Sequence, residues 1–281
     1  MVRPYAVKGR KLKRRRVEEP SPTEEEMVED VSDEGERETG VEVEEDEDER
    51  RAEEALDKTP VLPITGPVDR AKRPGVIFVL EKACLEVGKV GKNFQILNSD
   101  DHTNYLKKQN RNPADYRPDI IHQALLAIFD SPLAKAGRLQ AIYVKTEKGV
   151  LFEIKPHVRI PRTFKRFCGL MSQLLQKLSI TAVGKREKLL NVIKNPVTRH
   201  LPVNSKKIGL SYSSDKLVNL SNYVATASDD APLVFVVGAM AHGAISKEYI
   251  DDFVSISEYP LSAACCLNRI CSAFEQKWKI T

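Results

Sequence analysis

The chain has 281 residues, of which 41% are hydrophobic and 30% charged, enough for one large folded domain or two ordinary ones. Residues 1–72 hold 22 Asp/Glu and 14 Lys/Arg, which leaves 18 acidic and 30 basic residues, a net charge of +12, for residues 73–281. Such a basic body favours a polyanionic partner such as RNA, although a solvated surface also fits. No apolar stretch is long enough to span a bilayer, and the first residues lack the apolar core of a signal peptide, so we expect a soluble intracellular protein with no membrane partner.

The first 72 residues predict a disordered, charged tail. A basic cluster at 8–16 contains seven Lys/Arg, which fits a nuclear import signal, an RNA-binding arm or simply a charged tail. The acidic tract 17–57 places 21 acidic residues against three arginines, a composition that repels itself and cannot form a core. The Pro-rich linker 58–72 then leads to the folded part, which we expect to be one domain over residues 73–281.

The first half of that domain alternates strand and helix signals. The apolar run at 76–80 predicts a strand, and "YRPD" followed by helically spaced apolar residues at 120–134 predicts a helix. Two alternating runs in 139–156, separated by Glu147-Lys148-Gly149, predict a β-hairpin. Residues 162–179 have the pattern of an amphipathic helix.

The second half continues the alternation. We expect a short helix at 186–194, strands at 206–213 and 233–237, a helix at 246–253, a short strand at 254–257 and a final helix at 261–279. Strands that alternate with helices indicate a parallel sheet covered by helices. The predicted fold class is therefore α/β with an inserted β-hairpin extension.

The segment "LVFVVGAMAHG" at 233–243 has the pattern of a buried strand that feeds a glycine-rich loop. Its G-x-x-x-x-G spacing resembles a phosphate-binding loop, but Ala244 and Ile245 stand where that loop needs Lys and Ser/Thr, which argues against a nucleoside triphosphate. Met240 occupies the second glycine position of a dinucleotide-binding motif. By itself, the loop fits either a structural turn or a ligand site.

The cysteines and histidines do not form metal-binding patterns. The five cysteines form no C-x-x-C pair, and most of them lie inside apolar patterns. The five histidines are dispersed, with no H-x-x-x-H pair. We therefore predict reduced cysteines, without a disulfide or a bound metal.

Several long motifs occur together and in order. "YRPDIIHQALL", "PHVRIPRTFKRFCGLMSQLL", "IKNPVTRHLP" and "LSYS" precede "GAMAHG", and "ISEYPLSAA" follows it. Together they closely resemble the eukaryotic pseudouridine N(1)-methyltransferase family that acts on small-subunit ribosomal RNA, a branch of the SPOUT superfamily. The resemblance covers residues 74–280 and leaves out the tail.

The resemblance implies a SPOUT-type trefoil-knotted parallel sheet with flanking helices, a homodimer, and S-adenosyl-L-methionine bound between three loops. It assigns Leu210 to the first loop and Gly238 and Gly243 to the second. The third loop then comprises Ile256, Ser257, Glu258, Tyr259, Pro260 and Leu261. Glycines allow the backbone to approach the adenosine closely, and the third loop can supply an apolar wall, although an ordinary turn before a helix capped by Ser262 also fits.

The same resemblance assigns RNA-binding residues. Arg117 would contact RNA near the target nucleotide, with Asp119 orienting its guanidinium, although Asp119 could instead cap the following helix. Arg159, Arg162 and Arg166 match the family's other RNA-binding arginines. Their spacing predicts that Arg162 and Arg166 share one face of a helix, and a wet surface face is the alternative to an RNA contact.

The implied activity is methyl transfer from S-adenosylmethionine to N(1) of a pseudouridine in small-subunit (18S) ribosomal RNA or its precursor. The resemblance also implies a role in 40S subunit biogenesis, pre-ribosomal protein partners and a nuclear, nucleolar location. No residue is assigned as the base that removes the N(1) proton. A non-enzymatic RNA-binding assembly factor and a methyltransferase for another RNA base are the alternatives.

Overall fold

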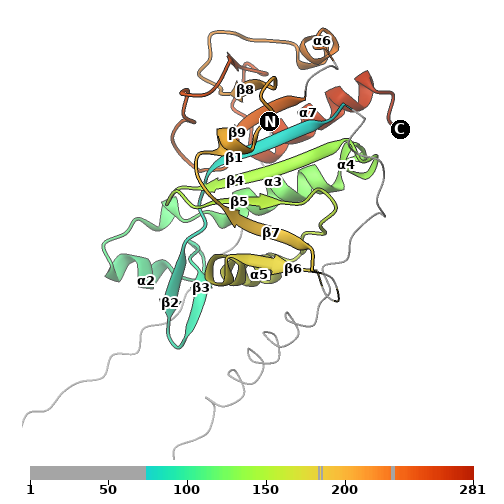
Figure 1. The fold of residues 1–281 in the computed structure, drawn as a ribbon. Coiled ribbons are helices and arrows are strands. Elements are labelled where there is room, and N and C mark those ends of the chain that lie inside the picture. The colour runs from blue at the N-terminus through green and yellow to red at the C-terminus, as the bar shows by residue number, and fades with distance from the viewer. Residues whose placement is uncertain (1–73, 183, 185, 229–231) are drawn as a thin grey trace, which may run out of the picture. The chain divides into compact units, whose positions relative to one another are not determined.

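The computed structural model describes residues 74–281 except 183, 185 and 229–231. The expectations for the tail therefore lie outside the described residues. Within this part, one eight-stranded sheet runs through the fold in the order β10-β8-β9-β1-β4-β5-β7-β6 (Figure 1). All four strand pairs from β10 to β4 are parallel, so the expected α/β class with a mainly parallel sheet is confirmed.

The sheet has a parallel and an antiparallel half. The parallel half consists of β10 (Asp252–Val254), β8 (Lys206–Leu210), β9 (Leu233–Gly238), β1 (Val76–Ala83) and β4 (Leu139–Thr146). The antiparallel half adds β5 (Leu151–Ile154), β7 (Lys188–Ile193) and β6 (Ser179–Thr181) to β4. The predicted hairpin is thus the β4–β5 pair, which extends the sheet.

Strand β1 is central because both its faces and both its edges are covered. Val76, Phe78 and Leu80 belong to one buried cluster, and Ile77 and Val79 belong to another on the opposite face. Successive strand residues point to opposite faces, so a continuous apolar run is what a strand covered on both sides requires. The pairing of β1 with β4 and β9 satisfies its backbone.

Helices cover one face of the sheet, where the larger cluster lies (Figure 1). They are α3 (Pro118–Asp130), α4 (Pro132–Lys135), α5 (Phe164–Lys177), α6 (Leu220–Ala225) and α7 (Ala263–Lys277). The other face is covered by the turn η3 (Val197–His200) and by the segment that follows β9. A small hairpin of β2 (Val87–Val90) and β3 (Asn93–Ile96), then α2 (Thr103–Lys108) and η2 (Pro113–Asp115), connect β1 to α3.

Two predicted helices are wrong. Residues 186–194 contain strand β7, because "LLNVI" pairs with β5 and β6 on its two sides, and its apolar spacing fits either structure at this length. Residues 246–253 form turns that lead into β10. Part of that segment is held by side-chain hydrogen bonds from elsewhere in the fold instead of a helical ladder.

Candidate functional site

The carboxyl ends of parallel strands meet at one edge of the sheet, and the loops that leave them surround a cavity of about 780 Å³. Ligands of open α/β sheets bind at such an edge, and this volume suits a ligand of cofactor size. The three loops follow β8, β9 and β10. Their residues in the cavity wall are Leu210–Ser213, Val237, Gly238, Met240–Ile245, Ser255–Ser257, Tyr259 and Leu261.

Seven of the nine residues assigned to the cofactor lie in this wall: Leu210, Gly238, Gly243, Ile256, Ser257, Tyr259 and Leu261. Glu258 and Pro260 belong to the same third loop but are outside the wall. The sequence assignment did not include Ser211–Ser213 or Met240–His242, which also line the cavity. Their signal was present, since both sets fall inside the quoted "LSYS" and "GAMAHG" motifs.

The two glycines of the second loop differ in what they require. Gly243 has a φ of +109°, in the region that disfavours residues with a Cβ. A Cβ on Gly238 would lie 2.7 Å from the methyl carbon of Met240 and 3.3 Å from Ile245. Gly243 therefore sets the loop's path, and Gly238 allows the loop to fold back closely on the end of β9.

Arg117 and Asp119 lie in the wall of the same cavity, at the start of α3. The guanidinium donates two hydrogen bonds to the carboxylate, from Nε at 2.8 Å and from Nη2 at 2.7 Å. These bonds hold the pKa of Asp119 below its ordinary value. The expected pairing is present, and the bidentate geometry fixes the plane of the arginine fork.

The remaining predicted arginines are exposed but lie outside the cavity wall. Arg166 is on α5, whereas Arg162 precedes Thr163, the N-cap of that helix, so the expected shared helical face for the two is wrong. Arg162 instead forms an ion pair with Asp130 at the end of α3, with Nη2 3.0 Å from the carboxylate. The two arginines do not share a helical face because the helix begins at Phe164, two residues later than the sequence pattern indicates.

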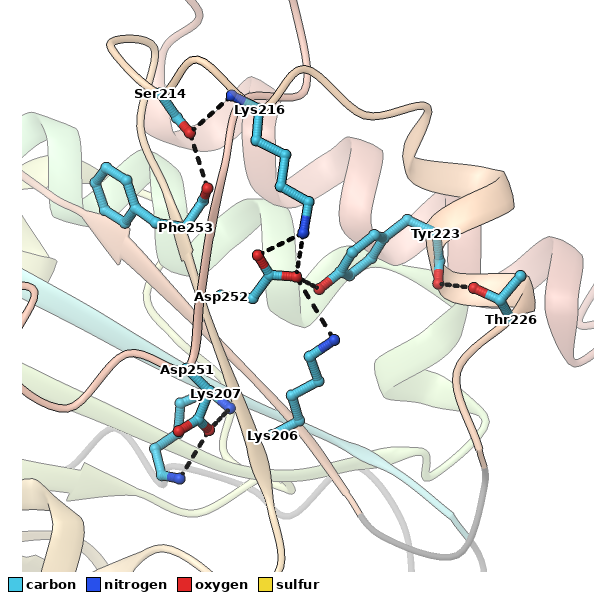
Figure 2. Close-up of polar contacts among 9 residues, drawn as sticks. All are labelled: Lys206, Lys207, Ser214, Lys216, Tyr223, Thr226, Asp251, Asp252 and Phe253. Atoms are coloured by element: carbon cyan, nitrogen blue, oxygen red, sulfur yellow. Dashed lines mark hydrogen bonds and ion pairs between the residues drawn. The ribbon is translucent and has the colours of Figure 1, made fainter.

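The first loop is fastened to β10 by a carboxylate network (Figure 2). Asp252 accepts hydrogen bonds from Nζ of Lys216 at 2.7 and 2.8 Å and from the Tyr223 hydroxyl at 2.6 Å. Burial raises the pKa of Asp252, but these bonds outweigh burial and lower it below the ordinary value. The Ser214 hydroxyl also donates to the main-chain oxygen of Phe253 at 2.8 Å. The network therefore fixes the loop that follows β8 beside the strand that leads into the third loop.

The thiol of Cys266 also lies in the cavity wall. Burial raises the pKa of Cys266 to about 11, so its thiol is neutral near pH 7.

All five cysteines are free thiols. Within residues 74–281, leaving out 183, 185 and 229–231, no group of three or more His, Cys, Asp or Glu side chains is placed to bind a metal ion. No helix in the same part of the chain is long and apolar enough to cross a membrane.

Comparison with known proteins gives a consistent result. The model of the EMG1/NEP1 methyltransferase family matches residues 78–275. The ribosomal RNA small subunit methyltransferases NEP1 of Mus musculus and Drosophila melanogaster are 52% and 50% identical to this chain, over 73% of it and 82% and 83% of their own lengths. The crystal structure of Archaeoglobus fulgidus Nep1 bound to S-adenosylhomocysteine shares the fold, with a TM-score of 0.60 at 22% identity over 73% of this chain and 99% of that one. The chain belongs to the EMG1/NEP1 methyltransferase family.

Proposed function

We propose that this protein transfers a methyl group from S-adenosyl-L-methionine to N(1) of a pseudouridine in small-subunit ribosomal RNA, during 40S subunit biogenesis. One observation carries the proposal: in a member of this methyltransferase family, a cavity built by three loops also contains the paired Arg117 and Asp119. The proposed cofactor site and the proposed nucleotide-orienting pair therefore share one cavity.

The residues of the cavity fit S-adenosylmethionine. Leu210, Ile256 and Leu261 offer apolar contact, while the missing side chain of Gly243 leaves room for a ligand to approach the backbone closely. When bound, the sulfonium supplies an activated methyl group, so much of the remaining catalysis is positioning. We propose that all nine residues of the three predicted loop segments, Glu258 and Pro260 included, form the cofactor site, with the last two shaping the third loop.

Pseudouridine presents a second ring N–H at N(1), whose proton must leave when the methyl carbon bonds to that nitrogen. We assign to Arg117, held by Asp119, the task of orienting the target nucleotide. The paired carboxylate is weakly basic because its pKa is lowered, which supports an orienting role over proton removal. Arg159, Arg162 and Arg166 are proposed to bind phosphates of the flanking RNA.

Replacing Arg159, Arg162 or Arg166 individually by Ala should weaken RNA binding and reduce its salt dependence by about one phosphate contact per substitution. The reason is that exposed guanidinium groups release counterions from RNA when they pair with phosphates. Titrations of a labelled hairpin across a salt series measure both effects. Arg199→Ala is the matched control, because Arg199 is exposed on η3, which covers the opposite face of the sheet from α5. An unchanged slope for all three variants would contradict the phosphate contacts.

The homodimer and the trefoil knot belong to this proposal. Three large apolar side chains of the cavity loops are exposed in the single chain: Tyr212 at 60%, Leu217 at 50% and Tyr259 at 72%. Exposed apolar groups gathered near a site are typical of an interface. Sedimentation equilibrium of the purified protein should give twice the mass of the chain, and a monomer at micromolar concentration would contradict the dimer.

We further propose that residues 1–72 direct the protein to the nucleolus and to pre-ribosomal proteins, while residues 73–281 carry the fold and the activity. A truncated protein that begins at Arg73 should fold, bind the cofactor and methylate a short RNA, yet accumulate poorly in the nucleolus. Circular dichroism, a methylation assay and fluorescence microscopy of tagged proteins measure these properties. Loss of folding on truncation would contradict the division.

The proposed activity is tested with two RNA hairpins that differ only in pseudouridine or uridine at one position. Each is incubated with the protein and isotopically labelled S-adenosylmethionine, then examined by mass spectrometry. We expect label in the pseudouridine hairpin alone. Equal labelling of both hairpins would indicate another base as the substrate, and RNA binding without any labelling would favour a non-enzymatic assembly factor.

A further inference from the structure

Glu81 is a buried carboxylate directly beneath the second loop of the cavity. It lies near the end of β1, opposite Gly238 in the β1–β9 register, and is 2% exposed. Its main-chain oxygen accepts a hydrogen bond from the N–H of Ala239 at 2.7 Å. The residue is therefore fixed to the point where the chain leaves β9 and enters the loop.

The side chain of Glu81 holds the other end of the same loop. One carboxylate oxygen accepts the Ser246 N–H at 3.2 Å, and the other accepts the Tyr249 hydroxyl at 2.7 Å. Burying a carboxylate costs free energy unless hydrogen-bond donors satisfy it. Both donors are therefore needed to keep the Glu81 side chain in this position. One residue thus grips both ends of the segment 239–246, of which Met240–Ile245 line the cavity.

The backbone next to Glu81 departs from a regular strand. The β1–β4 register shifts between Leu80 and Ala83, and Lys82 has a φ of +56°, which a non-glycine residue adopts at a cost. The Lys82 Nζ lies 4.0 Å from the place that a Cβ on Gly243 would take. Strained backbone persists where the surroundings hold it and is concentrated at functional sites. The end of β1 therefore departs from a regular strand where it meets the second loop of the cavity.

We propose that Glu81, with Tyr249 as its main side-chain partner, is a positioning residue that holds the second loop in the conformation that binds S-adenosylmethionine. The inference rests on the proposed cofactor site. Apparent affinity falls in proportion to the fraction of molecules in the binding-competent conformation. Release of either end would lower that fraction, so the clamp acts on cofactor binding through the loop, without touching the methyl group.

The test compares Glu81→Gln, Glu81→Ala and Tyr249→Phe. We expect Glu81→Ala to weaken S-adenosylmethionine binding and raise its KM by about tenfold or more, and Tyr249→Phe by about threefold to tenfold. RNA affinity and kcat at saturating cofactor should stay near the original values. Glu81→Gln should retain most of the affinity, because its amide can accept from Ser246 and donate to the tyrosine oxygen. Calorimetry with S-adenosylmethionine measures cofactor affinity, and steady-state kinetics measure KM and kcat separately.

Tyr143→Phe is the matched control. Its buried hydroxyl donates to the main-chain oxygen of His200 at 3.1 Å, away from the cavity wall, so its loss should lower thermal stability and leave cofactor affinity unchanged. If Glu81→Ala does not fold, Tyr249→Phe still decides the matter, because it removes one donor to the carboxylate and leaves Glu81 in place. Unchanged cofactor affinity in folded variants would overturn the clamp. Failure of the original protein to bind the cofactor would instead overturn the proposed function.

Discussion

Gly243→Val should reduce S-adenosylmethionine affinity on the order of tenfold or more while the protein remains folded. A β-branched side chain strongly disfavours the backbone at a φ of +109°, so the loop must change its path. Because the neighbouring space is open, with only Lys82 Nζ at 4.0 Å, the loss arises from the backbone and not from a collision in the core. Isothermal calorimetry on the purified variant measures the effect.

Gly149→Val is a matched control for this substitution. Gly149 also has a positive φ, +83°, with no neighbouring atom within 4 Å of an added Cβ, but it lies in the turn between β4 and β5. Gly149→Val should lower the free energy of unfolding by a similar amount to Gly243→Val without changing cofactor affinity. If Gly243→Val bound the cofactor as tightly as the original protein, the second loop would have to be removed from the cofactor site.

Arg117→Ala and Asp119→Ala should share one defect at the target nucleotide, each lowering kcat/KM for the pseudouridine hairpin by about tenfold or more. The double variant should be little worse than the worse single one, because the two hydrogen bonds make the residues act as a unit. Methylation kinetics on the hairpin, with cofactor affinity measured alongside, give these numbers. Fully additive losses would contradict the assignment of the pair.

The pH dependence of this pair follows from the lowered pKa of Asp119. A depressed carboxyl pKa means that the ion pair's contribution is complete above the unfolded value, about 3.9, and disappears as the pH falls through the folded value. The pair is thus fully charged throughout a neutral assay range, and changing the pH from 6 to 8 should not rescue either variant. Thermal stability must be followed as well, since Asp119 lies in the first turn of α3.

The two central strands could be predicted because each begins with an uninterrupted run of five apolar residues, at 76–80 and 233–237. The runs that became β1 and β9 cannot be accommodated except between two covered faces. The segment 186–194 was misassigned because "LLNVI" is short and its pairing with β5 and β6 is a long-range property. Likewise, no local pattern indicates that 246–253 would be held by Glu81.

The candidate site, like the fold, could be predicted from the sequence only in part. The resemblance and the glycines predict the loops, and the resemblance predicts the Arg117–Asp119 pairing, with which the spacing of two residues is compatible. Glu81 was not found, because a single acidic residue at the end of an apolar strand resembles the beginning of a solvated turn. Its role is visible only once β9 is placed beside β1 and the returning chain brings Tyr249 within 2.7 Å of its carboxylate.

The most direct test of the proposed activity is the position of the transferred methyl group. After reaction of the pseudouridine hairpin, the nucleosides are released and compared by chromatography and tandem mass spectrometry with synthetic 1-methylpseudouridine and 3-methylpseudouridine. We predict that the label from S-adenosylmethionine coincides with the N(1) isomer alone. Label in the N(3) isomer, in the ribose, or in no nucleoside at all would contradict the proposal.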